Sequence, residues 1–286
     1  MKLQWTQHRS PPGQRAPSAS TSPGTVVYAI GDIHGRIDLL DAIHQGIEQD
    51  AKLRPARRRL LVYLGDYISR GPDSRAVVDR VIGWRPQGGT RGVAQNFDVV
   101  ALKGNHEELL LRFLDGDLFV GRHWLGYGGA DTLAHYGGPL GDPRSCDADA
   151  LAAARARLSA AMPREHRAFL RGLVTSHREG DYFFAHAGIL PGVPLEGQSD
   201  RDLVWIRNRF LRSDADHGAV VVHGHCIAAE PEVRHNRIGI DTGAYDSGVL
   251  TCLVLDGAER SFLQTGPSIR NGPAEARGAV CPDSSQ

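Results

Sequence analysis

The sequence predicts an α/β fold, because short apolar runs alternate with segments of helical periodicity. Five runs of five or six residues are rich in apolar, β-branched or aromatic side chains, and each ends in a polar turn that contains glycine. Runs of this length suit buried strands. We expect strands near residues 25–30, 59–64, 98–103, 181–185 and 218–223.

Helical periodicity follows the first three runs. Apolar residues recur there at the three- and four-residue spacing that places them on one helix face. The sets are Leu39, Leu40, Ile43 and Ile47, then Val77, Val78, Val81 and Ile82, then Leu109, Leu110, Phe113 and Leu114. Asp73 and Ser74 precede the second set and are candidate caps for its helix. Strand, turn and helix units in series predict an α/β architecture.

We expect one globular domain over residues 24–265. Residues 1–23 and 266–286 are rich in proline, serine, glycine and other polar residues, with almost nothing to bury, so we predict two disordered tails. Within the domain, residues 150–173 predict one or two further helices, and the chain from about residue 219 predicts mostly strands.

The composition excludes several partners. Lys+Arg and Asp+Glu both number 33 in 286 residues, so no net charge attracts nucleic acid or an anionic membrane. No apolar run approaches the roughly 18 residues of a membrane span, and the N-terminal residues lack the apolar core of a secretory signal. The 4 cysteines lie far apart without a CxxC pair, which argues against a disulfide framework and favours a cytoplasmic location.

The polar turns after the five runs carry candidate metal ligands. They read "GDIHG", "GDYISRG", "GNHEE", "HAG" and "GH". Ligands of open α/β sheets bind at the carboxyl ends of the strands, where all five turns lie. Carboxylates, imidazoles and an amide together suit divalent metal ions. These side chains are Asp32, His34, Asp66, Asn105, His106, His186 and His225.

This set of side chains could perform hydrolysis at phosphorus. One carboxylate, such as Asp66, can bridge two metal ions. Two ions about 3.5–4 Å apart can ionise a water between them into a hydroxide nucleophile and hold the oxygens of an in-line displacement. His106, next to a ligand, could protonate the leaving oxygen as a general acid. Arg70 could hold phosphoryl oxygens bidentately.

The five motifs, in this order over residues 30–226, resemble the signature of the calcineurin-like metallophosphoesterases, specifically the phosphoprotein-phosphatase branch. The resemblance implies a two-layered β-sandwich flanked by helices, with a dinuclear metal site. It implies that the first metal is held by Asp32, His34 and Asp66, and the second by Asp66, Asn105, His186 and His225.

The same resemblance implies roles beyond the metal ligands. His106 matches the general acid, and Arg70 matches an arginine that contacts phosphate. Arg207, in "LVWIRNRF", resembles a second such arginine, so the substrate would meet Arg70, Asn105 and Arg207. The expected cofactors are two divalent metal ions, with manganese preferred and iron or zinc as alternatives.

Two further features leave alternatives open. His223, in "HGH", could bind metal, but its place within the preceding strand favours a core or supporting histidine. The glycine-rich segment 126–138 lacks the spacing of a nucleotide-binding loop. It resembles a substrate-side segment of bacterial family members, and it could equally be a plain connector.

Ser69 departs from the family pattern. Phosphoprotein phosphatases of this family usually read Gly-Asp-x-x-Asp-Arg-Gly, and the second aspartate pairs with the general-acid histidine. A serine can accept a hydrogen bond there, but it carries no charge to stabilise an imidazolium. We therefore expect slower protonation of poor leaving groups, which would reduce turnover without abolishing it.

The departure leaves two substrate classes. Symmetrical diadenosine tetraphosphate hydrolases share this scaffold and also lack that aspartate, but they read Gly-Asn-His-Asp where this chain has Glu107. We favour phosphomonoesters, above all phosphoserine or phosphothreonine in proteins. The alternative is a symmetrical bis(5'-nucleosyl)-tetraphosphate hydrolase that could also act on nucleotide-capped RNA. A non-catalytic binder would lack metal ligands, and all seven candidate positions carry competent ones.

Overall fold

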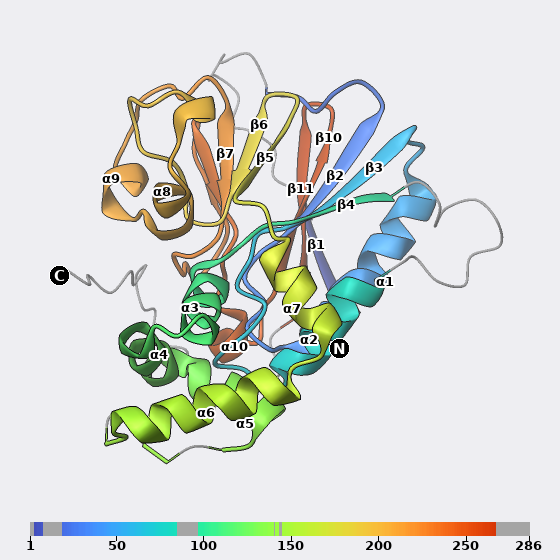
Figure 1. Ribbon diagram of the computed structural model, residues 1–286. Coiled ribbons are helices and arrows are strands. Elements are labelled where there is room, and N and C mark those ends of the chain that lie inside the picture. Colours follow the sequence, from blue (N-terminus) through green and yellow to red (C-terminus); the bar gives the residue numbers. More distant parts are fainter. Residues whose placement is uncertain (1–2, 8–18, 85–96, 140, 143–144, 267–286) are drawn as a thin grey trace.

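The computed structural model describes residues 3–7, 19–84, 97–139, 141–142 and 145–266. It contains two mixed β-sheets with helices on their outer faces (Figure 1), as the sequence predicts. The six-stranded sheet has the order β1-β11-β10-β2-β3-β4. Its strands are β1 Leu3–Gln7, β11 Glu259–Thr265, β10 Thr251–Asp256, β2 Thr25–Ile30, β3 Arg58–Tyr63 and β4 Phe97–Ala101.

The five-stranded sheet has the order β5-β6-β7-β9-β8. Its strands are β5 Ser176–Glu179, β6 Tyr182–Ala185, β7 Val220–His223, β9 Arg237–Gly239 and β8 Glu232–Val233. Strands β6, β7 and β9 run parallel to one another, as do β2, β3 and β4 of the other sheet. The carboxyl ends of the three strands in each parallel set therefore lie at one edge.

Alternating side chains of one strand contribute to two different layers of the hydrophobic core. In β2, Val27 and Ala29 join a buried cluster with residues of the second sheet such as Phe184 and Val222. Val26 and Tyr28 of the same strand join a different cluster, which includes residues of the helices. Successive side chains of a strand point to opposite faces, so one strand serves both layers of the core.

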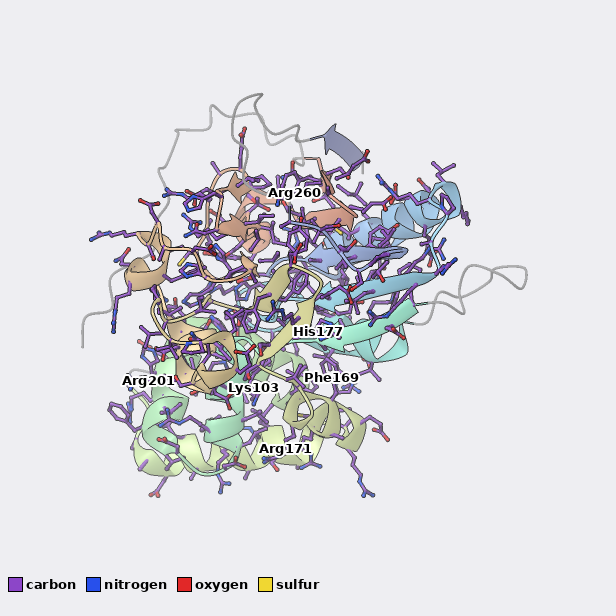
Figure 2. The ribbon with its side chains drawn as sticks, turned by 90° about the horizontal axis from the view of Figure 1, so that it is seen from above. Lys103, Phe169, Arg171, His177, Arg201 and Arg260 are labelled. Carbon is purple, nitrogen blue, oxygen red and sulfur yellow. The ribbon has the colours of Figure 1, made fainter. Side chains whose placement is uncertain are left out.

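Seven consecutive α-helices among the described residues share one hydrophobic cluster with the six-stranded sheet. They are α1 Ile37–Leu53, α2 Ser74–Gly83, α3 Asn105–Leu114, α4 Leu118–Trp124, α5 Ala130–Gly137, α6 Ala148–Ala161 and α7 Arg164–Arg171. Seen from above (Figure 2), α7 with Phe169 and Arg171 lies on one side of the molecule and β11 with Arg260 on the other. The predicted cap Asp73 accepts a hydrogen bond from the backbone N–H of Ala76 at 2.8 Å.

Smaller helices complete the fold. A π-helical turn, η2 Leu125–Gly129, joins α4 to α5, and a 3₁₀ turn, η3 Leu195–Gly197, precedes α8. The last helices are α8 Asp200–Trp205, α9 Asn208–Leu211 and α10 Ala244–Ser247. Residues of α8 and α9 pack on the outer face of the second sheet in a third cluster with Phe183 and Val221. No described helix combines the length and the apolar character that a membrane span needs.

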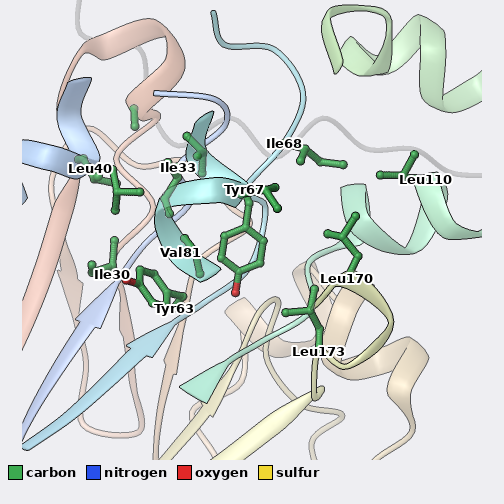
Figure 3. Packing of buried hydrophobic residues seen from close by; sticks show 14 of the residues in the cluster. Ile30, Ile33, Leu40, Tyr63, Tyr67, Ile68, Val81, Leu110, Leu170 and Leu173 are labelled. Atoms are coloured by element: carbon green, nitrogen blue, oxygen red, sulfur yellow. The ribbon is translucent and has the colours of Figure 1, made fainter. Parts of the chain in front are cut away.

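The motif "GDYISRG" is anchored in the core by its two apolar residues, Tyr67 and Ile68. Figure 3 shows Tyr63 and Tyr67 among aliphatic side chains that include Ile30, Val81 and Leu170. The Tyr67 hydroxyl donates to the carbonyl oxygen of Leu102 at 2.8 Å. These contacts hold the turn against β2, α2 and α7.

Two expectations need correction. Residues 3–7, expected in a disordered tail, form β1 and pair antiparallel with β11, because backbone pairing does not require apolar side chains. Thr21 is buried and its N–H donates to the carbonyl oxygen of Gly257, so the ordered domain begins before residue 24. The other residues of both predicted tails, 1–2, 8–18 and 267–286, lie outside the described part of the chain.

The spacing of the cysteines argued against a disulfide framework, and one described cysteine is nevertheless in a disulfide. Cys226 is disulfide-bonded, whereas Cys146 and Cys252 are free. The expected cytoplasmic location rested partly on the absence of disulfides, and it stays an expectation.

Buried His44 should make stability depend on pH. Its Nε2 lies 2.8 Å from the Tyr63 hydroxyl, and burial, aided by Arg80, lowers the pKa of His44 to about 3. Since an unfolded histidine titrates near 6.5, the unfolded chain gains a proton below that pH while the folded chain does not. As the pH falls from about 6.5 to 3, His44 alone should therefore lower the free energy of unfolding by about 1.4 kcal/mol per pH unit.

Urea unfolding at pH 7.0 and pH 5.5 tests this. We expect the wild type to lose about 1 kcal/mol more than His44→Gln, which keeps an acceptor for Tyr63. The exposed His235→Gln variant serves as the matched control and should follow the wild type. Equal losses in the wild type and His44→Gln would contradict the prediction.

Candidate metal centre

The strand register brings the predicted motifs to one end of the sandwich. Ile30, Tyr63 and Ala101 are paired across β2, β3 and β4, so the three strands end level with one another. The motifs "GDIHG", "GDYISRG" and "GNHE" begin within three residues of these ends. In the second sheet, His186 follows β6 directly, and His225 lies two residues beyond β7.

Asp66 lies at the middle of this end. Its Oδ2 is 3.5 Å from His34 Nε2 and 3.6 Å from His186 Nε2. Its Oδ1 accepts a hydrogen bond from the His106 N–H at 3.0 Å. The described residues contain two groups able to hold a metal ion, and both include Asp66: one with His34 and His106, the other with His186 and His225. One carboxylate thus faces both candidate metal positions.

Backbone carbonyls fix the tautomers of two histidines. His34 Nδ1 lies 2.8 Å from the carbonyl oxygen of Ile68, and His186 Nδ1 lies 2.9 Å from that of Leu64. Because a carbonyl only accepts, each Nδ1 carries the proton and each Nε2 presents its lone pair to the centre. This arrangement is typical of metal-binding histidines.

Asn105 supplies an oxygen between two imidazoles. Its Oδ1 lies 3.0 Å from His186 Nε2 and 3.0 Å from His225 Nδ1, while its Nδ2 is buried without a hydrogen-bond partner among the described residues. His186 Nε2 and Asn105 Oδ1 are then two acceptors facing each other. A cation between them would satisfy both lone pairs, so the donor set fits a divalent metal ion.

Asp32 stands slightly apart from the two groups. Its carboxylate accepts from the His225 N–H at 3.1 and 3.2 Å and lies beside the carboxyl group of Asp241. Burial, then the charges of Asp241 and Asp66, raise the pKa of Asp32 well above its usual value. Three carboxyl groups thus share a buried space with little positive charge, which a divalent cation would stabilise.

The charge balance around Asp66 is different. Burial alone would raise its pKa, but His186, His106 and His34 outweigh burial and hold the pKa of Asp66 below its usual value. Burial lowers the pKa of each of these three histidines, so the imidazoles of His34 and His186 are available as neutral ligands.

The two predicted arginines lie at the open side of the centre, and both are half-buried. An Arg70 Nη1–H points at His34 Nε2 from 3.2 Å, and Arg207 Nε donates to His225 Nε2 at 3.0 Å. All the residues predicted for the site are therefore brought together. His223 instead lies in the core, with Nε2 3.3 Å from Arg237 Nη1.

Backbone strain is concentrated at the centre. Among the described residues that are not glycine, positive φ angles occur only within the predicted motifs. They belong to His34, Asp66, Ser69, Arg70 and His225. Such conformations cost of the order of 1–3 kcal/mol each and mark sites where geometry serves function.

Two motif glycines allow close approach of a carboxylate to the backbone. A β-carbon at Gly104 would overlap Asp66 Oδ1, and one at Gly224 would overlap Asp32 Oδ1. The glycines of "GNH" and "HGH" therefore make room for the candidate ligands rather than for a turn alone.

Glu107 is a supporting residue that the sequence motifs did not reveal. It is fully buried, and its carboxylate accepts from the backbone N–H groups of Asp66, Tyr67 and Gly104, each at 2.9 Å. Burial, opposed by these donors, raises the pKa of Glu107 to about 8. Glu107 thus joins the turn after β3 to the turn after β4 and sets the position of Asp66.

Three other residues near the centre were missed. Asp241 follows β9 in "GIDTG", so the strand-end rule that found the other ligands would have found it too. Burial raises the pKa of Asp241 to about 6. Tyr127 and Tyr245 have rings 4.8 and 5.0 Å from the Arg70 guanidinium, and no local sequence pattern signals that contact.

The support from Glu107 can be tested directly. Glu107→Gln would place an amide N–H group against backbone donors, so we expect the affinity for Mn²⁺ to fall by about ten- to a hundredfold. Isothermal titration calorimetry measures it. The matched control is Glu108→Gln, because neighbouring Glu108 accepts from Trp205 Nε1 instead and the glutamine oxygen retains that bond. Equal affinities in the two variants would refute this role.

Comparison with known proteins agrees with this geometry. An asymmetrical bis(5'-nucleosyl)-tetraphosphatase, PrpE of Anoxybacillus flavithermus, is 28% identical over 248 residues, 78% of this chain and 88% of that protein. The solved structure of a protein provisionally described as a diadenosine tetraphosphatase superposes with a TM-score of 0.54 at 18% identity, covering 89% of this chain and 100% of the other.

A cold-active protein tyrosine phosphatase superposes with a TM-score of 0.50 at 16% identity, covering 83% of this chain and 77% of the other. At these identities the two solved structures show a shared fold. The family model of the calcineurin-like phosphoesterases matches residues 25–242, which is more than half of the sequence. The chain therefore belongs to the calcineurin-like phosphoesterase family.

Proposed function

We propose that the chain hydrolyses phosphomonoesters at a dinuclear metal centre. The observation that carries the proposal is the shared carboxylate: Asp66 takes part in both groups of candidate metal ligands. One ion would be held by Asp32, His34 and Asp66, and the other by Asp66, Asn105, His186 and His225. We propose manganese, with iron or zinc as alternatives, because oxygen and nitrogen ligands of this kind accept all three.

Residues of the chain would bind the phosphoryl group and protonate the leaving oxygen. Two divalent cations, when bound, lower the pKa of a water and neutralise charge on the phosphoryl oxygens. Arg70 and Arg207, at the open side, would hold the phosphoryl group through charge-assisted hydrogen bonds. As the bond from phosphorus to the leaving oxygen breaks, His106 would give that oxygen a proton.

For the substrate we propose phosphoserine or phosphothreonine in proteins as the first class. The order of the five motifs, which is that of the phosphoprotein-phosphatase branch, supports this choice. A small phosphomonoester presents the same reacting group to the centre, so it is the appropriate first probe.

Dinucleoside tetraphosphates are the second candidate class. Two observations favour them: the 28% identical relative is named for that activity, and Ser69 replaces the aspartate usual in protein phosphatases. The half-buried ring of Tyr245 beside Arg70 would also suit a nucleobase.

Substitution of the shared carboxylate tests the dinuclear centre. Asp66→Asn should lose Mn²⁺-stimulated hydrolysis of p-nitrophenyl phosphate near neutral pH, because both metal positions lose a charged ligand. Asp98→Asn is the control, since Asp98 is exposed on β4 and pairs with Arg58 instead. Full activity of Asp66→Asn would exclude the proposed centre.

Product analysis with diadenosine tetraphosphate separates the substrate classes. Rapid formation of two ADP would indicate the symmetrical hydrolase, and ATP with AMP would indicate the asymmetrical reaction for which the relative is named. Turnover far below that of phosphoserine peptides, measured by chromatography under the same conditions, is the result we expect.

A further inference from the structure

The His106 ring is held by other rings rather than by hydrogen bonds. It is fully buried, and neither Nδ1 nor Nε2 has a hydrogen-bond partner among the described residues. The Tyr127 ring stacks on it at a centroid distance of 5.0 Å and an interplanar angle of 17°. The His34 ring meets it edge-on at 4.9 Å. Two aromatic contacts therefore define the plane of this imidazole.

Ser69 does not take part in holding the ring. Its hydroxyl is buried without a hydrogen-bond partner in the described residues. Its backbone N–H is engaged elsewhere, by Thr132 Oγ1 at 2.9 Å and Ser74 Oγ at 3.1 Å. The Asp66 carboxylate accepts from the His106 backbone N–H, but no side chain of the "GDYISRG" turn forms a hydrogen bond with the His106 imidazole.

Tyr127 is held in place by the same turn. It lies in η2, where Tyr127 and Gly128 depart from helical geometry, with φ of 99° at Gly128. The carbonyl oxygen of Gly128 accepts from the Arg70 N–H at 3.1 Å, and Thr132 of α5 accepts from Ser69. The glycine-rich segment is therefore docked on the phosphate-side turn, and its position carries the Tyr127 ring to His106.

Tyr127 could act through its contact with Arg70 instead of through His106. A comparison with Tyr245 separates these two roles. Tyr127 and Tyr245 lie at similar distances from the Arg70 guanidinium, 4.8 and 5.0 Å. Only Tyr127 stacks on His106, whereas Tyr245 meets His34 edge-on at 5.4 Å. Loss of Tyr245 should therefore disturb Arg70 without disturbing the His106 ring.

We propose that Tyr127 is a positioning residue that fixes the plane of the His106 imidazole by stacking, so that the ring can protonate the leaving oxygen. The inference rests on the proposed role of His106 as general acid. The aromatic face performs this role, and the Tyr127 hydroxyl does not. Tyr127 acts through His106 and does not itself exchange a proton with substrate.

The test compares two aryl phosphates whose leaving groups differ. Phenolate from phenyl phosphate needs protonation far more than nitrophenolate from p-nitrophenyl phosphate. We expect Tyr127→Leu to lower kcat for phenyl phosphate by about ten- to a hundredfold, with a much smaller loss for p-nitrophenyl phosphate. Tyr127→Phe, which keeps the ring, should match the wild type on both substrates.

Tyr245→Leu is the matched control. It should raise KM on both substrates and weaken inhibition by inorganic phosphate, while the ratio of the two kcat values stays that of the wild type. A changed ratio in Tyr245→Leu, an equal loss on both substrates in Tyr127→Leu, or a Tyr127→Phe that behaves like Tyr127→Leu would each overturn the proposal.

Failure of this inference can be told from failure of the proposed function. If His106→Asn leaves the ratio of kcat values unchanged, His106 is not the general acid and the proposed mechanism fails. If His106→Asn changes the ratio of kcat values, the double variant His106→Asn/Tyr127→Leu decides the inference. The inference is supported if the double variant has the same ratio as His106→Asn. A further change in the ratio would show that Tyr127 acts independently of His106. Metal content by mass spectrometry should be unaltered in Tyr127→Leu, and loss of metal would overturn the positioning role.

Discussion

The whole centre depends on a buried carboxylate that is not a candidate ligand. Glu107 accepts from backbone N–H groups on two turns, and so fixes Asp66 relative to Asn105 at the start of α3. Because Asp66 faces both metal positions, a displacement of this one carboxylate would alter both ligand groups at once. Burial disfavours the charged form of Glu107, and the three backbone donors offset part of that cost, which leaves the pKa of Glu107 at about 8.

In the turn after β3, the burial of apolar side chains offsets the strain in the backbone of their neighbours. Asp66, Ser69 and Arg70 have positive φ angles, whereas Tyr67 and Ile68 between them are buried in the hydrophobic core. Burial of two large apolar side chains contributes about 1.5–3 kcal/mol each, which is comparable with the strain of their neighbours. The apolar residues of the motif thus hold its polar residues in conformations that they would not adopt alone.

Local sequence rules predicted the candidate ligands but missed the residues whose roles depend on distant contacts. Strand ends and side-chain chemistry were enough to predict Asp32, His34, Asp66 and the later ligands, because each comes after an apolar run. Glu107 resembles an ordinary acidic residue in the first turn of a helix, and two of its three backbone partners lie about forty positions away. Tyr127 reaches His106 only through an irregular π-helical turn whose geometry the sequence does not signal. Strand β1 was missed because its pairing with β11 is made by the backbone.

That first strand has a consequence for where the chain can be cut. In the described residues, β1 pairs with β11 from Leu3 opposite Thr265 to Gln7 opposite Ser261, so it forms the border of the six-stranded sheet. Truncation before residue 24, at the boundary that composition suggests, would leave the backbone N–H and C=O groups along one side of β11 unpaired. Exposed borders of this kind recruit strands from other molecules, so a shortened protein with an intact centre would be prone to aggregation.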